Sequence, residues 1–116
     1  MLASMVKALR DVTNAEAAAI VNRDGGIVAA ELPSTVSPET FSIMCAAILG
    51  AGMTAAAEMK HKAPRRVLLE SVDATILIEE VGRRGMVVLV LPPDQSLDRL
   101  DDVLRRFSKS AAQYVG

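Results

Sequence analysis

The 116-residue sequence contains no tryptophan, one tyrosine and two phenylalanines, so aromatic residues make up only 3% of the chain. This scarcity argues against binding of nucleobases or sugars, since such sites stack their ligands on aromatic side chains. Hydrophobic residues of all kinds still make up 51%, so the interior must be built from aliphatic side chains. Without linkers or repeats, this length predicts one compact domain over residues 1–116.

Cysteine and histidine occur once each, as Cys45 and His61. A single cysteine excludes an intrachain disulfide and fits a reducing compartment. Cys45 lies in an apolar segment, which favours a buried hydrophobic role over a reactive thiol. The single histidine excludes histidine clusters as metal sites and leaves no nucleophile pair with a suggestive context, so we favour a solvated helix-end position for His61. We therefore expect no metal, no cofactor and no catalytic residue.

The chain also lacks a surplus of either charge, since 13 basic and 14 acidic residues give a formal net charge of −1. Nucleic-acid binding needs a basic surplus on one face, so nucleic acid is not an expected partner. Lys7, Arg10 and Asp11 interrupt any apolar run that could serve as a signal peptide. We therefore expect a cytoplasmic protein.

Apolar spacing, turn residues and prolines divide the chain into helices and strands. The residues Asn22 to Gly26 tolerate positive φ and predict a β-hairpin, while Ser37-Pro38 predicts the start of a helix. The order α-β-β-α-β-β-β-α predicts an α/β (α+β) fold in which helices cover both faces of one five-stranded antiparallel sheet. The predicted elements are a helix over Met1–Thr13, strands over Ala17–Val21 and Ile27–Ala30, a long helix from Ser37 to about His61, strands over Arg66–Val72, Thr75–Val81 and Met86–Leu91, and a closing helix from Leu97 to Gly116.

The long central helix is apolar around nearly its whole circumference, because between Phe41 and Ala57 only Ser42, Cys45 and Thr54 are polar. Such a helix needs two burial partners. We expect the side with larger residues to lie on the sheet: Phe41, Met44, Cys45, Ile48, Gly52, Ala55, Ala56 and Met59. The opposite side carries Ile43, Ala46, Ala47, Gly50, Thr54 and Ala57.

On that opposite side, Ala46, Gly50 and Thr54 are four residues apart and leave a shallow groove for close approach of another helix. A glycine inside a helix costs about 1 kcal/mol relative to alanine, which suggests a packing reason for keeping it. A symmetric copy of the helix is favoured as the cover over another helix of the same chain, because the two terminal helices can share the other face of the sheet. A membrane span is disfavoured, since the apolar stretch is short and its alanines and glycines are weakly lipophilic.

Three features carry a resemblance to a known family: the hairpin from Ala18 to Ala30 with its Asp24-Gly25 turn, the alanine-rich second helix, and the strand Val67-Leu68-Leu69-Glu70. Over essentially its full length the chain resembles the Roadblock/LC7 domain family, whose architecture is profilin-like. This resemblance implies that two subunits pair their second helices and join their third strands, here Arg66 to Val72, into one continuous sheet. The opposite side of the helix and this strand together give the predicted interface residues: Ile43, Ala46, Ala47, Gly50, Thr54, Ala57, Arg66, Leu68 and Glu70.

The same resemblance implies the function. Family members include dynein light chains, subunits of scaffolds that hold small GTPases, and bacterial and archaeal dimers encoded with Ras-like GTPases. The expectation is therefore a non-catalytic homodimeric adaptor or regulator that binds a small Ras-like GTPase and in some members activates hydrolysis without inserting an arginine. The alternative is a structural scaffold or motor light-chain-like subunit that binds a peptide or assembly independently of nucleotide.

Other charged and glycine-rich segments give no catalytic pattern. The glycines near Gly25 and Gly82 match no phosphate-binding loop and are explained as turns. Solvated turn residues are the favoured interpretation of Arg65-Arg66 and Arg83-Arg84 over an arginine that contacts a phosphoryl group. The adjacent pairs Glu79-Glu80 and Asp101-Asp102 are expected to serve solubility, and no convergent polar set predicts a ligand pocket.

Overall fold

The computed structural model describes residues 1–115, which form three helices and five strands in the predicted order. Gly116, the predicted last residue of the closing helix, lies outside the described residues. The elements are α1 (Leu2–Thr13), β1 (Ala17–Asn22), β2 (Ile27–Glu31), α2 (Pro38–Glu58), β3 (Arg66–Glu70), β4 (Thr75–Val81), β5 (Gly85–Leu91) and α3 (Leu97–Val115).

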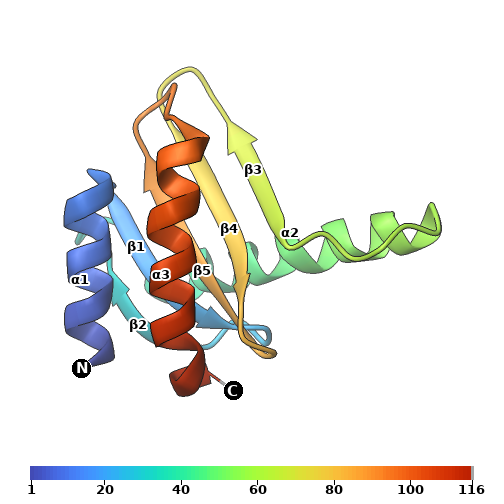
Figure 1. The fold of residues 1–116 in the computed structure, drawn as a ribbon, viewed down its shortest axis with the longest axis horizontal. Helices are drawn as coiled ribbons and strands as arrows, with labels where there is room; N and C mark the ends of the chain where they lie inside the picture. Colours follow the sequence, from blue (N-terminus) through green and yellow to red (C-terminus); the bar gives the residue numbers. More distant parts are fainter. Residues whose placement is uncertain (116) are drawn as a thin grey trace.

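The strands form a single five-stranded sheet in the order β2-β1-β5-β4-β3, and every neighbouring pair is antiparallel. The β1–β2 hairpin joins the β3–β4–β5 meander through β1, which pairs with β5 (Figure 1). β2 and β3 are therefore the two edges of the sheet. The predicted α+β fold with one antiparallel sheet is confirmed.

Local chemistry explains where the helices begin and end. Asn14 adopts the left-handed conformation, with φ of 57°, and terminates α1. At the start of α2, the Ser37 hydroxyl accepts a hydrogen bond from the Thr40 N–H at 3.4 Å, and proline follows at the first helical position. α2 ends at Glu58, three residues before the expected His61, because the chain turns at Lys60, where φ is 61°.

Two turns define the strand ends. In the β1–β2 turn, Gly25 has φ of 94°, and a Cβ there would lie 3.0 Å from Cγ1 of Ile43, so glycine suits both the conformation and the close packing against α2. β3 ends at Glu70, and the predicted end at Val72 is wrong. Its continuation is broken by a turn in which the Ser71 N–H donates to the Ala74 carbonyl at 2.8 Å.

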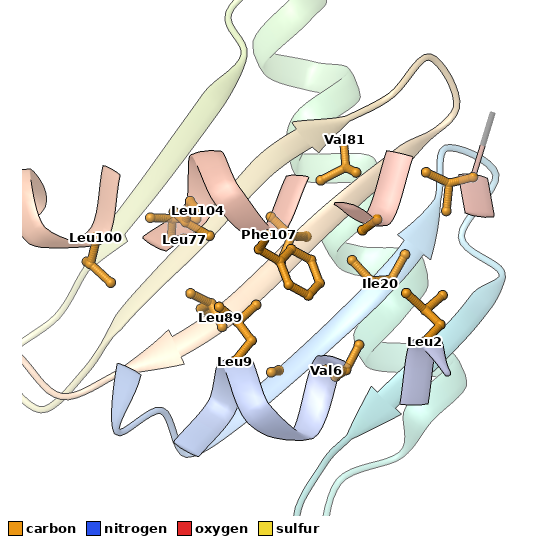
Figure 2. Packing of buried hydrophobic residues seen from close by; sticks show 14 of the residues in the cluster. Leu2, Val6, Leu9, Ile20, Leu77, Val81, Leu89, Leu100, Leu104 and Phe107 are labelled. Atoms are coloured by element: carbon orange, nitrogen blue, oxygen red, sulfur yellow. The ribbon is translucent and has the colours of Figure 1, made fainter. Parts of the chain in front are cut away.

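The terminal helices α1 and α3 lie side by side on one face of the sheet, as the sequence predicts (Figures 1 and 2). Their apolar stripes meet the inward residues of β1, β4 and β5 in the larger of two cores. Residues labelled in this core are Leu2, Val6 and Leu9 of α1, Ile20, Leu77, Val81 and Leu89 of the sheet, and Leu100, Leu104 and Phe107 of α3.

α2 covers the opposite face alone. Cys45 and Leu49 pack into a smaller core built from the other side of the same strands: Ala19, Val21, Ile78, Met86 and Val88. α2 crosses the sheet and its C-terminal half extends past the β3 edge (Figure 1). Only the first half of this apolar helix is therefore well covered by the chain's own sheet.

Candidate interaction surface

The side of α2 that contacts the sheet differs in part from the predicted side. Its buried residues are Ser42, Cys45 and Leu49. Phe41, Ile48, Gly52 and Ala56 are partly buried, as expected, and so are Met53 and Ala46. The expected burial of Met44, Ala55 and Met59 is wrong: all three are exposed, with Met44 at 53% and Met59 at 70%. Met59 also follows the last residue of α2.

The exposed side of α2, which we call the outer face of α2, is almost entirely apolar. Ile43 is 50% exposed on it, and the apolar stretch of this helix has only 17% of its residues buried. Among the helices of residues 1–115, α2 is the one long and apolar enough to cross a membrane by length and composition. The outer face consists of Ile43, Met44, Ala47, Gly50, Ala51, Thr54, Ala55 and Ala57.

Five of the six predicted helix residues therefore lie on the outer face: Ile43, Ala47, Gly50, Thr54 and Ala57. The sixth, Ala46, is partly buried against the smaller core, so its assignment to the free side is wrong. The helix is rotated so that Leu49 rather than Met44 points into the sheet. A helix that is apolar all round gives no polar face from which this rotation could have been deduced.

The two glycines inside α2 have different surroundings. A Cβ at Gly52 would lie 3.4 Å from Cγ2 of Val67 and 3.8 Å from Cγ of Pro64, in the segment that returns to β3. A Cβ at Gly50 would have no neighbour within 4 Å. The Thr54 hydroxyl donates to the Gly50 carbonyl at 3.1 Å, so this polar group is satisfied inside the helix. The middle of the outer face is thus small, apolar and open.

The β3 residues of the predicted interface, Arg66, Leu68 and Glu70, lie on the other side of the sheet. They pair with Glu79, Leu77 and Thr75, whose side chains face α3, whereas α2 lies beneath the opposite face. The fold therefore does not bring these three side chains together with the outer face of α2. β3 can still take part in an interface near α2, because it is an open edge strand whose backbone N–H and C=O groups are exposed.

Arg66 is held inside the fold by two carboxylates. Its guanidinium donates to Glu79 at 2.6 Å and to Asp101 at 2.5 Å, which ties β3 to β4 and α3. Burial opposes the charge, but the hydrogen bonds from Arg66 to Asp101 and Glu79 dominate and raise its pKa above the usual value. The expectation that Glu79 and Asp101 only serve solubility is wrong. The sequence could not show this pairing, because the three residues come from distant segments.

Glu80 points to the other side of β4, as expected for a neighbour of Glu79 in a strand. It forms an ion pair with Arg23 of the β1–β2 turn. The Arg23 guanidinium also lies 3.3 Å from the sulfur of Met53, so this turn is fixed to both β4 and α2.

Cys45 is 2% exposed, and burial raises the pKa of its thiol to about 11, which agrees with an inert hydrophobic role. His61 is exposed beyond the end of α2. Within residues 1–115, no three His, Cys, Asp or Glu side chains come close enough together to hold a metal ion.

A helix pair on one face of an antiparallel sheet and a single crossing helix on the other define the profilin-like class of α+β domains. The chain matches the Roadblock/LC7 domain over residues 1–91 and belongs to that family.

Solved structures confirm the fold. MglB from Myxococcus xanthus shares 14% identity and a TM-score of 0.88, with 97% of this chain and 93% of that chain covered. A Roadblock/LC7 domain from Streptomyces avermitilis gives 13% identity and a TM-score of 0.87, covering 97% and 95%. Profilin IA from Acanthamoeba castellanii gives 14% and 0.66, covering 98% of each chain. No curated protein sequence matches the chain.

Proposed function

We propose that this protein is a homodimeric, non-catalytic adaptor that binds and regulates a small Ras-like GTPase. The observation that carries the proposal is the outer face of α2, an exposed apolar helical surface on a small domain of this family. A continuous apolar surface of this kind is unusual on a stable monomer and is typical of an interaction site.

The sequence of the outer face favours antiparallel packing of two copies about Gly50. Ile43 and Ala57 lie seven residues before and after Gly50, so a two-fold axis at Gly50 places the large residue of one copy against the small residue of the other. Ala47 lies three residues before Gly50 and is likewise small. Because Gly50 has open space above it, the two helix backbones can approach closely there.

The β3 edge supports the same arrangement. Within residues 1–115, β3 pairs only with β4, and the projecting half of α2 lies beyond this edge. A second β3 added antiparallel to it would satisfy the free backbone groups and extend both sheets into one. In this proposal, β3 contributes main-chain hydrogen bonds, while Arg66, Leu68 and Glu70 keep their intrachain roles.

A cysteine placed at Gly50 tests the register of the two helices. Residues on a two-fold axis face their own copies, so we expect Gly50→Cys to form an intermolecular disulfide under mild oxidation, because the covalent bond traps the dimer even where the added side chain weakens non-covalent association. Wild-type protein is one control, because its single thiol, Cys45, is buried. Ser4→Cys on exposed α1 is the second. Equal crosslinking of Ser4→Cys and Gly50→Cys would argue against a specific α2 interface.

The GTPase role rests on family membership together with the exposed helical surface that a dimer would present. Titration of the protein with Ras-like GTPases from the same genome, loaded with GDP or a GTP analogue, tests it. We expect binding that depends on the nucleotide and a change in the rate of GTP hydrolysis. Binding to no GTPase in either nucleotide state would contradict the proposal.

The alternative function is a scaffold or light-chain-like subunit that holds a peptide or larger assembly. The open β2 edge and the apolar helix would both suit such a role. The same titration separates the two functions, because a scaffold would bind the GTPases equally well in both nucleotide states or would not bind them at all.

We also propose a cytoplasmic location without membrane insertion. Although α2 is apolar enough to span a bilayer, Ser42, Cys45 and Leu49 are buried against the sheet, and insertion would remove them from this core. Cell fractionation tests this point. Recovery in the carbonate-resistant membrane pellet would contradict it.

A further inference from the structure

Two turns meet at one end of the sheet and carry arginines. The register pairs Asn22 with Gly85, which places the β1–β2 and β4–β5 turns at the same end, next to the C-terminal half of α3 (Figure 1). The Arg23 N–H donates to the Arg84 carbonyl at 2.8 Å and joins the two turns. We call this surface the arginine end and define it by Arg23, Arg65, Arg66, Arg83, Arg84 and Arg105.

The arginine end contains two pockets. One, of about 320 Å³, lies between β3, β4 and α3 and is lined by Arg65, Arg105 and Ser108 together with the Arg66 ion pairs. The other, of about 680 Å³, lies between the two turns and the end of α3 and is lined by Arg23, Arg83, Arg84 and Tyr114. Both are open to solvent and have charged side chains in their linings, and the pocket beside Arg65 has the more polar surface.

Two buried polar atoms at this end lack partners. Among the buried side-chain nitrogen and oxygen atoms of residues 1–115, Nε of Arg23 and Oγ of Ser108 have no hydrogen-bond partner. Each belongs to a residue that lines one of the two pockets. A buried polar group without a partner is costly, so hydrogen bonding beneath both pockets is incomplete, although these two atoms are covered and are not themselves ligand contacts.

Three of the six arginines of the arginine end also lack a neighbouring carboxylate. Arg23, Arg66 and Arg105 form ion pairs with neighbouring carboxylates. Arg65, Arg83 and Arg84 have no carboxylate of residues 1–115 within 4.0 Å. The opposite end of the sheet carries Glu16, Asp73, Asp94 and Asp98, with Arg99 beside Asp94.

We propose that the arginine end binds an acidic peptide segment of a partner protein. The planar guanidinium group binds carboxylates through two parallel hydrogen bonds, and the free arginines lie in both pockets. Asp24 and Glu80 lie among them and would repel the closely spaced charges of a nucleic acid or an anionic membrane, whereas a peptide can space its carboxylates around them. This surface is distinct from the outer face of α2, so the inference goes beyond the proposed function.

Charge reversal in the β4–β5 turn tests the inference. The probe is a fluorescein-labelled peptide of alternating glutamate and serine, measured by fluorescence anisotropy with full-length protein. We expect Arg83→Glu/Arg84→Glu to weaken binding by at least about tenfold, since two charge-assisted contacts become repulsive. The matched control, Lys7→Glu/Arg99→Glu, changes the net charge equally at exposed positions outside the arginine end and should retain binding within about twofold. Thermal unfolding of both variants confirms that they are folded.

Three results would overturn the inference. Equal weakening in the control variant would show that only net charge matters. Equal binding of a lysine–serine peptide would show that the acidic charge is not recognised. Tighter binding to phosphatidylserine vesicles or to a single-stranded oligonucleotide than to the acidic peptide would assign the surface to another partner. Dimerisation should be unchanged in Arg83→Glu/Arg84→Glu. A failure of acidic-peptide binding can therefore be distinguished from a failure of the proposed dimer.

Discussion

At the scale of single residues, the most demanding position is Arg66. Its guanidinium lies between Glu79, which is 7% exposed, and Asp101, and it links β3 to β4 and α3. Removal of one member of a buried ion pair leaves the other charge without compensation, which costs more than the pair itself contributes. Arg66 is therefore a structural residue, although the sequence favoured a solvated arginine at this position.

We expect Arg66→Met to lower the free energy of unfolding by about 3 kcal/mol, because the buried Glu79 carboxylate loses its partner. Urea denaturation measures the loss. Arg105→Met is the control: its ion pair with Asp102 is exposed, with a side-chain accessibility of 74%, and its loss should cost less than about 1 kcal/mol. The double variant Arg66→Met/Glu79→Met should recover most of the loss. Similar losses for the two single variants would contradict the buried-pair interpretation.

Cys45 predicts a dependence of stability on pH. Burial raises the pKa of its thiol from 9.0 to about 11. Between these values the unfolded thiol has lost its proton while the folded thiol keeps it, so stability must fall as pH rises from about 9 to about 11. We expect Cys45→Ala to be less stable overall but to show a shallower decline over this range, measured by chemical denaturation. Parallel pH profiles for the two proteins would contradict a buried, protonated thiol.

At the scale of elements, α2 shows where sequence reasoning succeeds and where it stops. Ser37-Pro38 predicts its start correctly, and its apolar length predicts two contact sides. Its rotation was not predictable, because Met44 and Leu49 are equally apolar and only packing against the strands distinguishes them. Ion pairs such as Arg23–Glu80 were not predictable either, because they depend on which strands and turns become neighbours.

The two helix glycines give a prediction at this scale. Gly50→Ala and Gly52→Ala should each raise the stability of the dilute, dissociated chain by up to about 1 kcal/mol, since alanine favours helix and both positions have room for a methyl group. Only Gly50→Ala should weaken self-association, because its methyl group would separate the paired helices. Thermal unfolding and sedimentation equilibrium measure the two effects. Unchanged self-association of Gly50→Ala would contradict a crossing at Gly50.

At the scale of the whole molecule, the chain has three distinct surfaces. α1 and α3 close one face of the sheet, the outer face of α2 leaves the other side apolar, and the arginine end provides a charged site. Turn residues and hydrophobic spacing in the sequence predicted the order of elements and the helices on both faces. The sequence did not predict that Arg66, Leu68 and Glu70 lie on the opposite side of the sheet from α2. The direction of a strand's side chains depends on its register with the neighbouring strand.

The most direct test of the proposed dimer is the mass of the protein in solution, measured by sedimentation equilibrium at micromolar concentrations. We expect wild-type protein to have twice the chain mass of 12.3 kDa. Gly50→Arg should have the mass of a single folded chain, since a charge at the centre of the outer face of α2 cannot be buried without a partner. A wild-type protein that sediments as a monomer would contradict the proposal, and so would a Gly50→Arg variant that remains a dimer.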